Sequence, residues 1–257
     1  MNMWLLAVSV PLLPAIIMLS TRCRHRVSSL YHKALAWARK MVGGKVCVRR
    51  THAFVFTQCT HGKVDSVLET FDLYAAKNPS LAIDQDMGKI LDEAVMRLHP
   101  SSVLELGMHC GYSSVRMLRL LPPTGKLITV EMDPLTADLG EEIILVSGFK
   151  HHQFQVLTSS SANIIRTLHL FLDQNCRKGL DLVLMDHDPQ QYLPDLLALQ
   201  KEELLCSSGC SILFINRTRG SDEDLREVLA HVTLNPKYLS IGKHLPFILE
   251  VLYKKDD

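Results

Sequence analysis

After residue 63, most of the chain alternates between two patterns of apolar and polar positions, one typical of buried strands and one typical of amphipathic helices. Short runs of leucine, isoleucine and valine recur between longer segments in which apolar residues have helical spacing. Continuous apolar runs of this length are typical of buried strands in a parallel sheet. We expect such strands over Ser102–Leu106, Lys126–Glu131, Gln153–Leu157, Leu180–Met185 and Ser211–Ile215.

Amphipathic helices are predicted before and between these strands. Asp84 is a plausible N-cap for one of them. The predicted helices are Val64–Ala76, Asp84–Leu98, Tyr112–Leu121, Pro134–Ser147, Ser161–Leu172, Gln191–Leu204 and Asp222–His231. Strands and helices that alternate in this way build a parallel sheet with helices on both faces.

The end of the chain departs from that alternation. Two strand-like runs, Tyr238–Ile241 and Phe247–Tyr253, are separated by a short loop containing Gly, Lys, His and Pro. This spacing predicts a hairpin that adds antiparallel strands to the sheet edge. The expected fold class is therefore α/β, a doubly wound and mostly parallel seven-stranded Rossmann-like sheet with a C-terminal antiparallel hairpin.

The first residues predict a membrane anchor. Met3 to Leu19 is almost wholly apolar and uncharged, and Arg22, Arg24 and Arg26 follow it. Such a run reaches the lower end of the length that spans a bilayer, about 17 residues. It lacks the positive leading region and small-residue cleavage site of a signal peptide. The positive charges on its carboxyl side favour a cytosolic location for the rest of the chain.

These features divide the chain into three predicted parts. They are an anchor over residues 1–21, a basic juxtamembrane helix or linker over 22–50, and a domain over 51–257. The basic segment is either a simple connection or a surface for anionic lipid headgroups. The expected location is an endomembrane such as the endoplasmic reticulum, with the domain in the cytosol.

The charge balance and the cysteine spacing argue against nucleic-acid binding, a zinc site and a disulfide framework. Lys and Arg number 28 against 27 Asp and Glu, so the chain lacks the basic excess typical of a nucleic-acid-binding protein. The seven cysteines include no Cys-x-x-Cys pair. Neither a zinc site nor a disulfide framework is therefore indicated.

A glycine turn after the first predicted strand suggests a cofactor site. Gly107 and Gly111 follow that strand, and Glu131 ends the next one. Dinucleotide folds hold an adenosine-bearing cofactor at this edge, with the acidic residue on the ribose. The third glycine, which admits a diphosphate, is missing, so S-adenosylmethionine fits better than a dinucleotide. A nicotinamide dehydrogenase remains an alternative, disfavoured because no Tyr/Lys or His/Asp catalytic arrangement is evident.

Three segments carry a resemblance to a known family. VLELGMHCGYSS, LITVEMDP and MDHDPQQYLPD together resemble the catechol O-methyltransferase family of class I S-adenosylmethionine-dependent methyltransferases, over roughly residues 64–233. The predicted anchor and Pro189 are similar to its transmembrane O-methyltransferase branch. The resemblance implies a Rossmann-like methyltransferase fold and these cofactor-binding residues: Ile83, Glu105, Gly107, Tyr112, Ser113, Glu131, Met132, Ser161 and Asp186.

In that family these residues have separate roles. Ile83 packs near the cofactor, and Glu105, Gly107, Tyr112 and Ser113 surround its methionine part. Glu131 holds the ribose, Met132 lies on the adenine, Ser161 lies beside it, and Asp186 is near the sulfonium and the metal.

Structural alternatives exist for several of these positions. Ile83 and Met132 could be core residues, and Tyr112 and Ser113 could simply cap and pack a helix. Ser161 is a good candidate N-cap. Glu105 favours function more strongly, because a carboxylate inside an apolar strand is costly unless it is hydrogen-bonded.

The resemblance also implies magnesium and a lysine base, and here the chain departs from the pattern. Asp186 and Asn216 match two metal ligands, but Ile215 stands where an aspartate is expected. Pro189 stands where the lysine base is expected, and Asp188 replaces an aromatic wall. No late carboxylate is evident, since Glu250 in the last strand is more easily read as structural.

The general base is therefore unknown from sequence. His187 is a weak candidate because its charge changes near neutral pH. Asp188 is a weak candidate for a missing metal oxygen, and His109 lies in the glycine turn.

Two hypotheses remain from different classes. The first is a membrane-anchored O-methyltransferase that methylates a hydroxyl of a catechol or catecholamine-like molecule, with magnesium uncertain. The second is a weak or inactive methyltransferase fold that acts through a protein partner in membrane-protein assembly or trafficking, since fold does not fix function.

Overall fold

The computed structural model describes residues 48–78, 85–172, 179–216, 225–244 and 248–254. The chain divides into residues 1–47 and a compact unit over 48–257, and the described residues all belong to the second. The predicted anchor, most of the basic segment and Ile83 lie outside the described residues. Within the described ranges, no helix has the length and apolar character needed to cross a bilayer.

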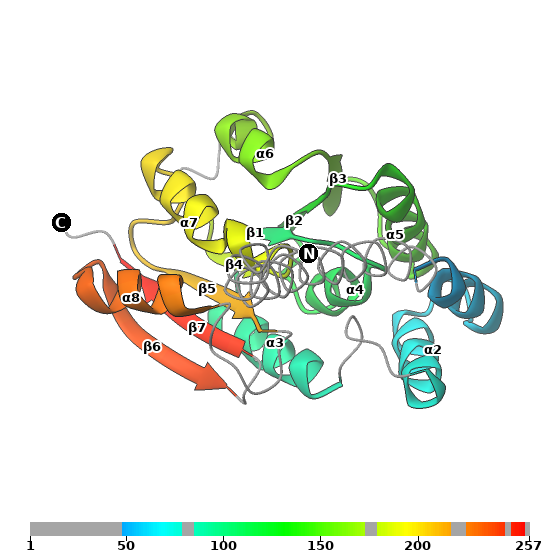
Figure 1. Ribbon diagram of the computed structural model, residues 1–257. Coiled ribbons are helices and arrows are strands. Elements are labelled where there is room, and N and C mark those ends of the chain that lie inside the picture. Colours follow the sequence, from blue (N-terminus) through cyan, green and yellow to red (C-terminus); the bar gives the residue numbers. More distant parts are fainter. Residues whose placement is uncertain (1–47, 79–84, 173–178, 217–224, 245–247, 255–257) are drawn as a thin grey trace, which may run out of the picture. The chain divides into compact units, whose positions relative to one another are not determined.

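One mixed sheet forms the centre of the compact unit (Figure 1). Its order is β3-β2-β1-β4-β5-β7-β6. The strands are β1 (Ser102–Leu106), β2 (Lys126–Glu131), β3 (Phe154–Thr158), β4 (Leu182–Met185), β5 (Cys210–Ile215), β6 (Tyr238–His244) and β7 (Ile248–Tyr253). Strands β1 to β5 pair in parallel, whereas β7 is antiparallel to both β5 and β6. The Rossmann-like α/β architecture with a C-terminal antiparallel hairpin is confirmed.

Helices cover both faces of this sheet. Residues 48–58 are also helical. The other helices are α2 (Val64–Lys77), α3 (Gln85–Leu98), α4 (Tyr112–Leu118), α5 (Pro134–Val146), α6 (Ser161–Thr167), α7 (Tyr192–Lys201) and α8 (Arg226–Leu234), with 3-10 turns η1 (Leu168–Leu170) and η2 (Pro189–Gln191). Helices α2 to α5 enclose one core cluster and α6 to α8 a second one on the other face.

Strand alternation decides which face each side chain reaches. Val103 in β1 and Leu182 in β4 belong to the core beneath α2 to α5, whereas Leu104 and Val183 belong to the core beneath α6 to α8. Successive residues of a strand point to opposite faces. The same alternation continues into the residues that follow β4, where most of the predicted chemistry lies.

Polar side chains fix the loops that connect β2 to α5 and β3 to α6. Asp133 caps α5 by accepting from the Thr136 backbone N–H at 3.0 Å. Ser160 caps α6 by accepting from the Asn163 N–H at 3.4 Å. The suggestion that Ser161 is an N-cap is therefore wrong by one residue, since Ser161 is already inside the helix.

Candidate functional site

The glycine turn between β1 and α4 brings two strand ends together. Gly107 and Gly111 have φ of +97° and +82°, a region that glycine enters without steric cost. A Cβ on Gly107 would lie 2.3 Å from the backbone oxygen of Asp186. Only glycine therefore lets the end of β1 approach the end of β4 this closely. His109 lies between the glycines with φ of +52°.

Glu105 is the deepest polar group of the site. Its side chain is fully buried in β1 and accepts hydrogen bonds from the Ser113 and Ser114 hydroxyls on α4. The Thr129 hydroxyl on β2 also donates to it, at 2.7 Å. Burial raises the pKa of Glu105 to about 7, the three hydrogen bonds oppose this shift, and the charge of Asp186 adds to it. These three hydrogen bonds offset part of the cost of burying the carboxylate, and its functional role stays a prediction.

Glu131 ends β2 at the same edge of the sheet. Its two carboxylate oxygens accept from the backbone N–H groups of His109 and Asp133, both at 3.1 Å. Burial raises the pKa of Glu131. A carboxylate has about four lone-pair sites, so these two bonds fix its orientation and leave acceptor capacity for a ligand. Met132 follows with 70% of its surface exposed, so the alternative that it belongs to the core is wrong.

Tyr112 and Ser113 begin α4 directly after the glycine turn. Tyr112 is 2% exposed, and its hydroxyl donates to Asp72 on α2 at 3.1 Å. The same hydroxyl accepts from Arg116 Nη1 at 2.7 Å. Ser113 is committed to Glu105. Tyr112 therefore packs against α2, and Ser113 is hydrogen-bonded to Glu105; whether either residue contacts a cofactor stays a prediction.

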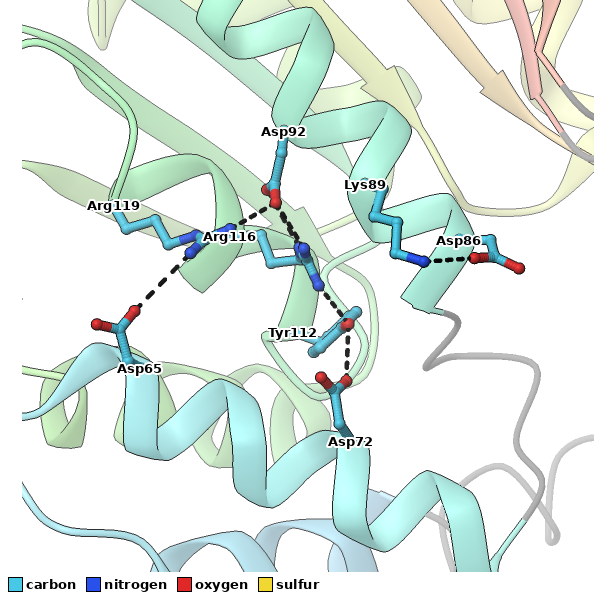
Figure 2. Close-up of polar contacts among 8 residues, drawn as sticks. All are labelled: Asp65, Asp72, Asp86, Lys89, Asp92, Tyr112, Arg116 and Arg119. Carbon is cyan, nitrogen blue, oxygen red and sulfur yellow. Dashed lines mark hydrogen bonds and ion pairs between the residues drawn. The ribbon is translucent and has the colours of Figure 1, made fainter.

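A buried ion-pair network extends from Tyr112 to two other helices (Figure 2). Arg116 donates from Nε to Asp92 Oδ1 at 3.1 Å and from Nη2 to the other carboxylate oxygen. Arg119 also pairs with Asp92. This network joins α4 to α2 and α3, and the sequence reasoning missed it. The only local signal was the i, i+4 spacing of Tyr112 and Arg116, which does not identify partners on other helices.

Asp186 and Asn216 lie at the ends of the neighbouring strands β4 and β5, as predicted. The Asp186 N–H donates to the Leu106 carbonyl at 2.8 Å, which fixes the backbone beside the glycine turn. Asp186 lines a cavity beneath α3 and α4. Ile215 and Ile248 line the same cavity.

The two weak candidates after Asp186 are held elsewhere. His187 Nε2 lies 2.8 Å from Asp195 Oδ2 on α7, and its ring packs edge-on against Tyr192. It therefore contacts the helix on the opposite face from the Asp186 cavity. Asp188 caps η2 by accepting from the Gln190 N–H at 3.3 Å. Pro189 is the first residue of η2.

The arrangement around Asp186 does not fit the magnesium site that the resemblance implies. Among the described residues, no group of three or more His, Cys, Asp and Glu could hold a metal ion. Magnesium demands near-octahedral oxygen ligands and gives up its water reluctantly. Asp186 has Ile215 and Ile248 beside it in the cavity instead.

Comparisons with known proteins agree with the fold and show the family. A family model described as O-methyltransferase matches residues 63–208. Human transmembrane O-methyltransferase is 34% identical over 212 residues, covering 80% of this chain and 70% of the relative. Mouse catechol O-methyltransferase is 37% identical over 145 residues, 56% of this chain and 53% of that protein.

Solved structures share the fold. An O-methyltransferase from Bacillus cereus, in complex with SAH, aligns with a TM-score of 0.60 and 19% identity, covering 73% of this chain and 90% of that chain.

Proposed function

Because the chain belongs to the O-methyltransferase family, we propose that it transfers the methyl group of S-adenosylmethionine to a hydroxyl of a catechol or catecholamine-like molecule. One observation carries the cofactor assignment. Two carboxylates, the buried Glu105 and the partly buried Glu131, are held in fixed orientation toward the carboxyl ends of adjacent parallel strands beside a glycine turn. This edge is where α/β sheets bind nucleotide-like ligands.

The residues divide between the two ends of the cofactor. Glu131 accepts both ribose hydroxyls through its remaining lone pairs, and the exposed Met132 lies on the adenine with Ser161 beside it. Glu105 and Ser113 face the charged methionine end, close to Gly107 and Tyr112. Ile83, outside the described residues, completes this set.

The fold contributes mainly alignment to the reaction. When bound, S-adenosylmethionine supplies a methyl group on a sulfonium, whose sulfur keeps the bonding pair as the acceptor oxygen takes the methyl carbon and releases its proton to water. Asp186 and the glycine turn position the two reactants, which is where most of the acceleration arises for an already activated donor. No side chain is assigned as the base, and no step requires a metal.

The anchor completes the proposal. Residues 1–21 hold the protein in an endomembrane, residues 22–50 connect them to the domain, and residues 51–257 carry the site on the cytosolic side. The name of the human relative, transmembrane O-methyltransferase, supports a membrane location.

A methyl-transfer assay with the full chain in detergent tests the activity. The protein is incubated with S-adenosylmethionine carrying a labelled methyl group and with a panel of catechols, and the product is identified by mass. Glu131→Gln should lower the affinity for the cofactor, while Glu69→Gln, on the exposed surface of α2, should not. The proposal fails if no acceptor gains the label while the cofactor binds normally.

The positions of His187 and Pro189 favour a second candidate function. His187 is hydrogen-bonded to Asp195 and Pro189 begins η2, so neither of these two residues serves as a base toward the Asp186 cavity. Such a protein could work through a membrane-protein partner during assembly or trafficking. A Glu131→Gln variant that no longer binds cofactor but keeps its full cellular role would favour this second candidate.

A further inference from the structure

The end of β5 forms an apolar wall beside Asp186. Ile215 is 2% exposed and lines the same cavity as Asp186. Ile248, its register partner on β7, is also 2% exposed and lines the cavity beside it. Leu184 and Leu213 extend this wall beneath α3. The two strands therefore present hydrocarbon, rather than oxygen, to the space next to the Asp186 carboxylate.

Two polar residues that follow Asp186 are engaged in other contacts. Alternation along β4 sends Asp186 to the face beneath α3 and α4 and His187 to the face beneath α7. There His187 is bonded to Asp195, itself 1% exposed. Asp188 is exposed and caps η2. Among the described residues that line the cavity, Asp186 supplies the one carboxylate.

A divalent cation at this position would be poorly solvated. Magnesium keeps several of its own waters when protein oxygens are few, and those waters need room and polar partners. The wall of this cavity is apolar on the β5 and β7 side and offers such waters no hydrogen-bond partner there. A hydrated ion would have to displace Ile215 or lose water without replacement.

We propose that this site works without a divalent cation, and that Ile215 makes the acceptor side of Asp186 an apolar surface that receives an aromatic acceptor through one hydroxyl. The inference rests on the proposed methyl transfer and names its acceptor class more closely. Without a cation to chelate two hydroxyls, the second hydroxyl of a catechol finds no partner in the apolar wall. Burying an unpaired hydroxyl costs about 1–3 kcal/mol, so a phenol with one hydroxyl is used at least as efficiently as catechol.

Direct metal titration tests this independently of turnover. The full chain in detergent, saturated with S-adenosylhomocysteine, is titrated with Mg²⁺ by calorimetry and with Mn²⁺ by electron paramagnetic resonance. The wild-type protein should bind neither ion at millimolar concentration. Ile215→Asp should bind both, at least about tenfold more tightly than Ile215→Asn, because a second carboxylate beside Asp186 attracts the cation.

Ile215→Asn is the matched control, since it has the shape of the aspartate variant without its charge. Adding Asp186→Asn to Ile215→Asp should remove the ion binding again. Titration of each variant with S-adenosylhomocysteine reports whether its site is folded. Wild-type binding of Mg²⁺ or Mn²⁺ that Asp186→Asn abolishes would overturn the proposal. Folded Ile215→Asp protein that binds no cation would equally overturn the role given to Ile215.

A second comparison keeps the proposal testable if the variants do not fold. Wild-type methyl transfer is measured with phenol and with catechol, each with and without EDTA. Rates that change by less than about twofold with EDTA support the proposal, whereas loss of activity contradicts it, because a catalytic metal is worth several kcal/mol. If no acceptor is methylated while the wild-type protein binds no cation, the proposed function fails and the metal inference stands.

Discussion

Gly107 sets the distance between the glycine turn after β1 and Asp186, which directly follows β4. Gly107→Ala would place a Cβ 2.3 Å from the Asp186 backbone oxygen, at a φ of +97°. Steric overlap and a left-handed alanine each cost about 1–3 kcal/mol, so we expect a loss of about 3 kcal/mol or more in the free energy of unfolding. Denaturant unfolding of the full chain measures it, with cofactor affinity falling in parallel.

Gly62→Ala is the matched control for this prediction. Gly62 also has a positive φ, +78°, but a Cβ added there would meet nothing within 4 Å. Its alanine variant should lose only about 1 kcal/mol from backbone strain. Equal losses for the two variants would show that the contact with Asp186 is unimportant.

Glu105 should make the cofactor-free protein less stable as pH rises. Its pKa is about 7 in the folded state, raised by burial from the ordinary 4.5. The folded state therefore binds the proton more tightly, so this contribution is fully present below pH 4.5 and is lost as pH rises through 7. Relative to wild type, Glu105→Gln should therefore gain roughly 3 kcal/mol of stability between pH 4.5 and pH 8, because the amide has no charge to bury.

Chemical unfolding from pH 5 to pH 8 in the absence of cofactor measures that difference. Glu69→Gln is the control, because it makes the same chemical change on the exposed surface of α2. The difference between Glu105→Gln and wild type should grow with pH, whereas the control should follow the wild-type curve. Parallel curves for all three proteins would contradict the prediction.

Single residues were predicted well where a motif constrained them. The glycine turn, Glu105 and Glu131 lie together because a strand end, a tight turn and a second strand end are local features of the sequence. The surroundings of His187 were not predictable in this way. Its bond to Asp195 depends on α7 packing against the other face of the sheet, which no spacing near His187 encodes.

At the scale of elements, the buried pair between Arg116 and Asp92 holds α4 against α3. Breaking a buried ion pair by removing one partner typically costs about 3–5 kcal/mol, and Arg119 still neutralises part of the Asp92 charge. We therefore expect Arg116→Met to lower the free energy of unfolding by about 3 kcal/mol. Denaturant titration of the full chain measures this loss.

Lys89→Met provides the comparison. Figure 2 shows that Lys89 forms a second ion pair, with Asp86, on α3, the helix that also carries Asp92. Lys89 and Asp86 lie 2.9 Å apart, but both side chains are 66% exposed. Exposed pairs contribute about 0–1 kcal/mol, so this variant should be close to wild type. Similar losses for Arg116→Met and Lys89→Met would mean that burial does not decide the strength of these pairs.

The boundaries of the helices and strands were predicted accurately only where the sequence pattern changes abruptly. The predicted bounds of β1 and β2 match the structure because each is a short, nearly continuous apolar run. Helix ends were harder: α4 was expected to reach Leu121 but ends at Leu118, shortly before Pro122 and Pro123. Proline lacks the N–H that would bond the carbonyl four residues back and its ring clashes with that carbonyl; for Pro122 this is the carbonyl of Leu118, the last residue of α4.

At the scale of the whole molecule, the three carboxylates proposed to bind the cofactor share one face of the sheet. The α2 to α5 face carries Glu105, Glu131 and Asp186, while the α6 to α8 face holds His187 among buried contacts. This division follows from strand alternation, so the sequence predicted the fold and the shared position of these carboxylates together. It could not predict the apolar wall at Ile215, which forms only when β7 pairs antiparallel to β5.

If residues 1–21 form a membrane anchor, the full chain should behave as an integral membrane protein in cell membranes. An apolar run near the length of a bilayer span should resist extraction by alkaline carbonate, whereas a chain lacking residues 1–21 should be released. Protease added from the cytosolic side should digest the domain over residues 51–257. The cause is the cluster Arg22, Arg24 and Arg26, since positive residues beside a span stay in the cytosol.

Replacing these three arginines with alanine tests that cause. The variant should remain resistant to carbonate, because the apolar run is unchanged, but a fraction of its domains should become protected from protease. Carbonate release of the wild-type chain would contradict an integral anchor. Full protease protection of the wild-type domain would instead show that the orientation is the opposite of the one proposed. The methyl-transfer site would then lie on the lumenal side.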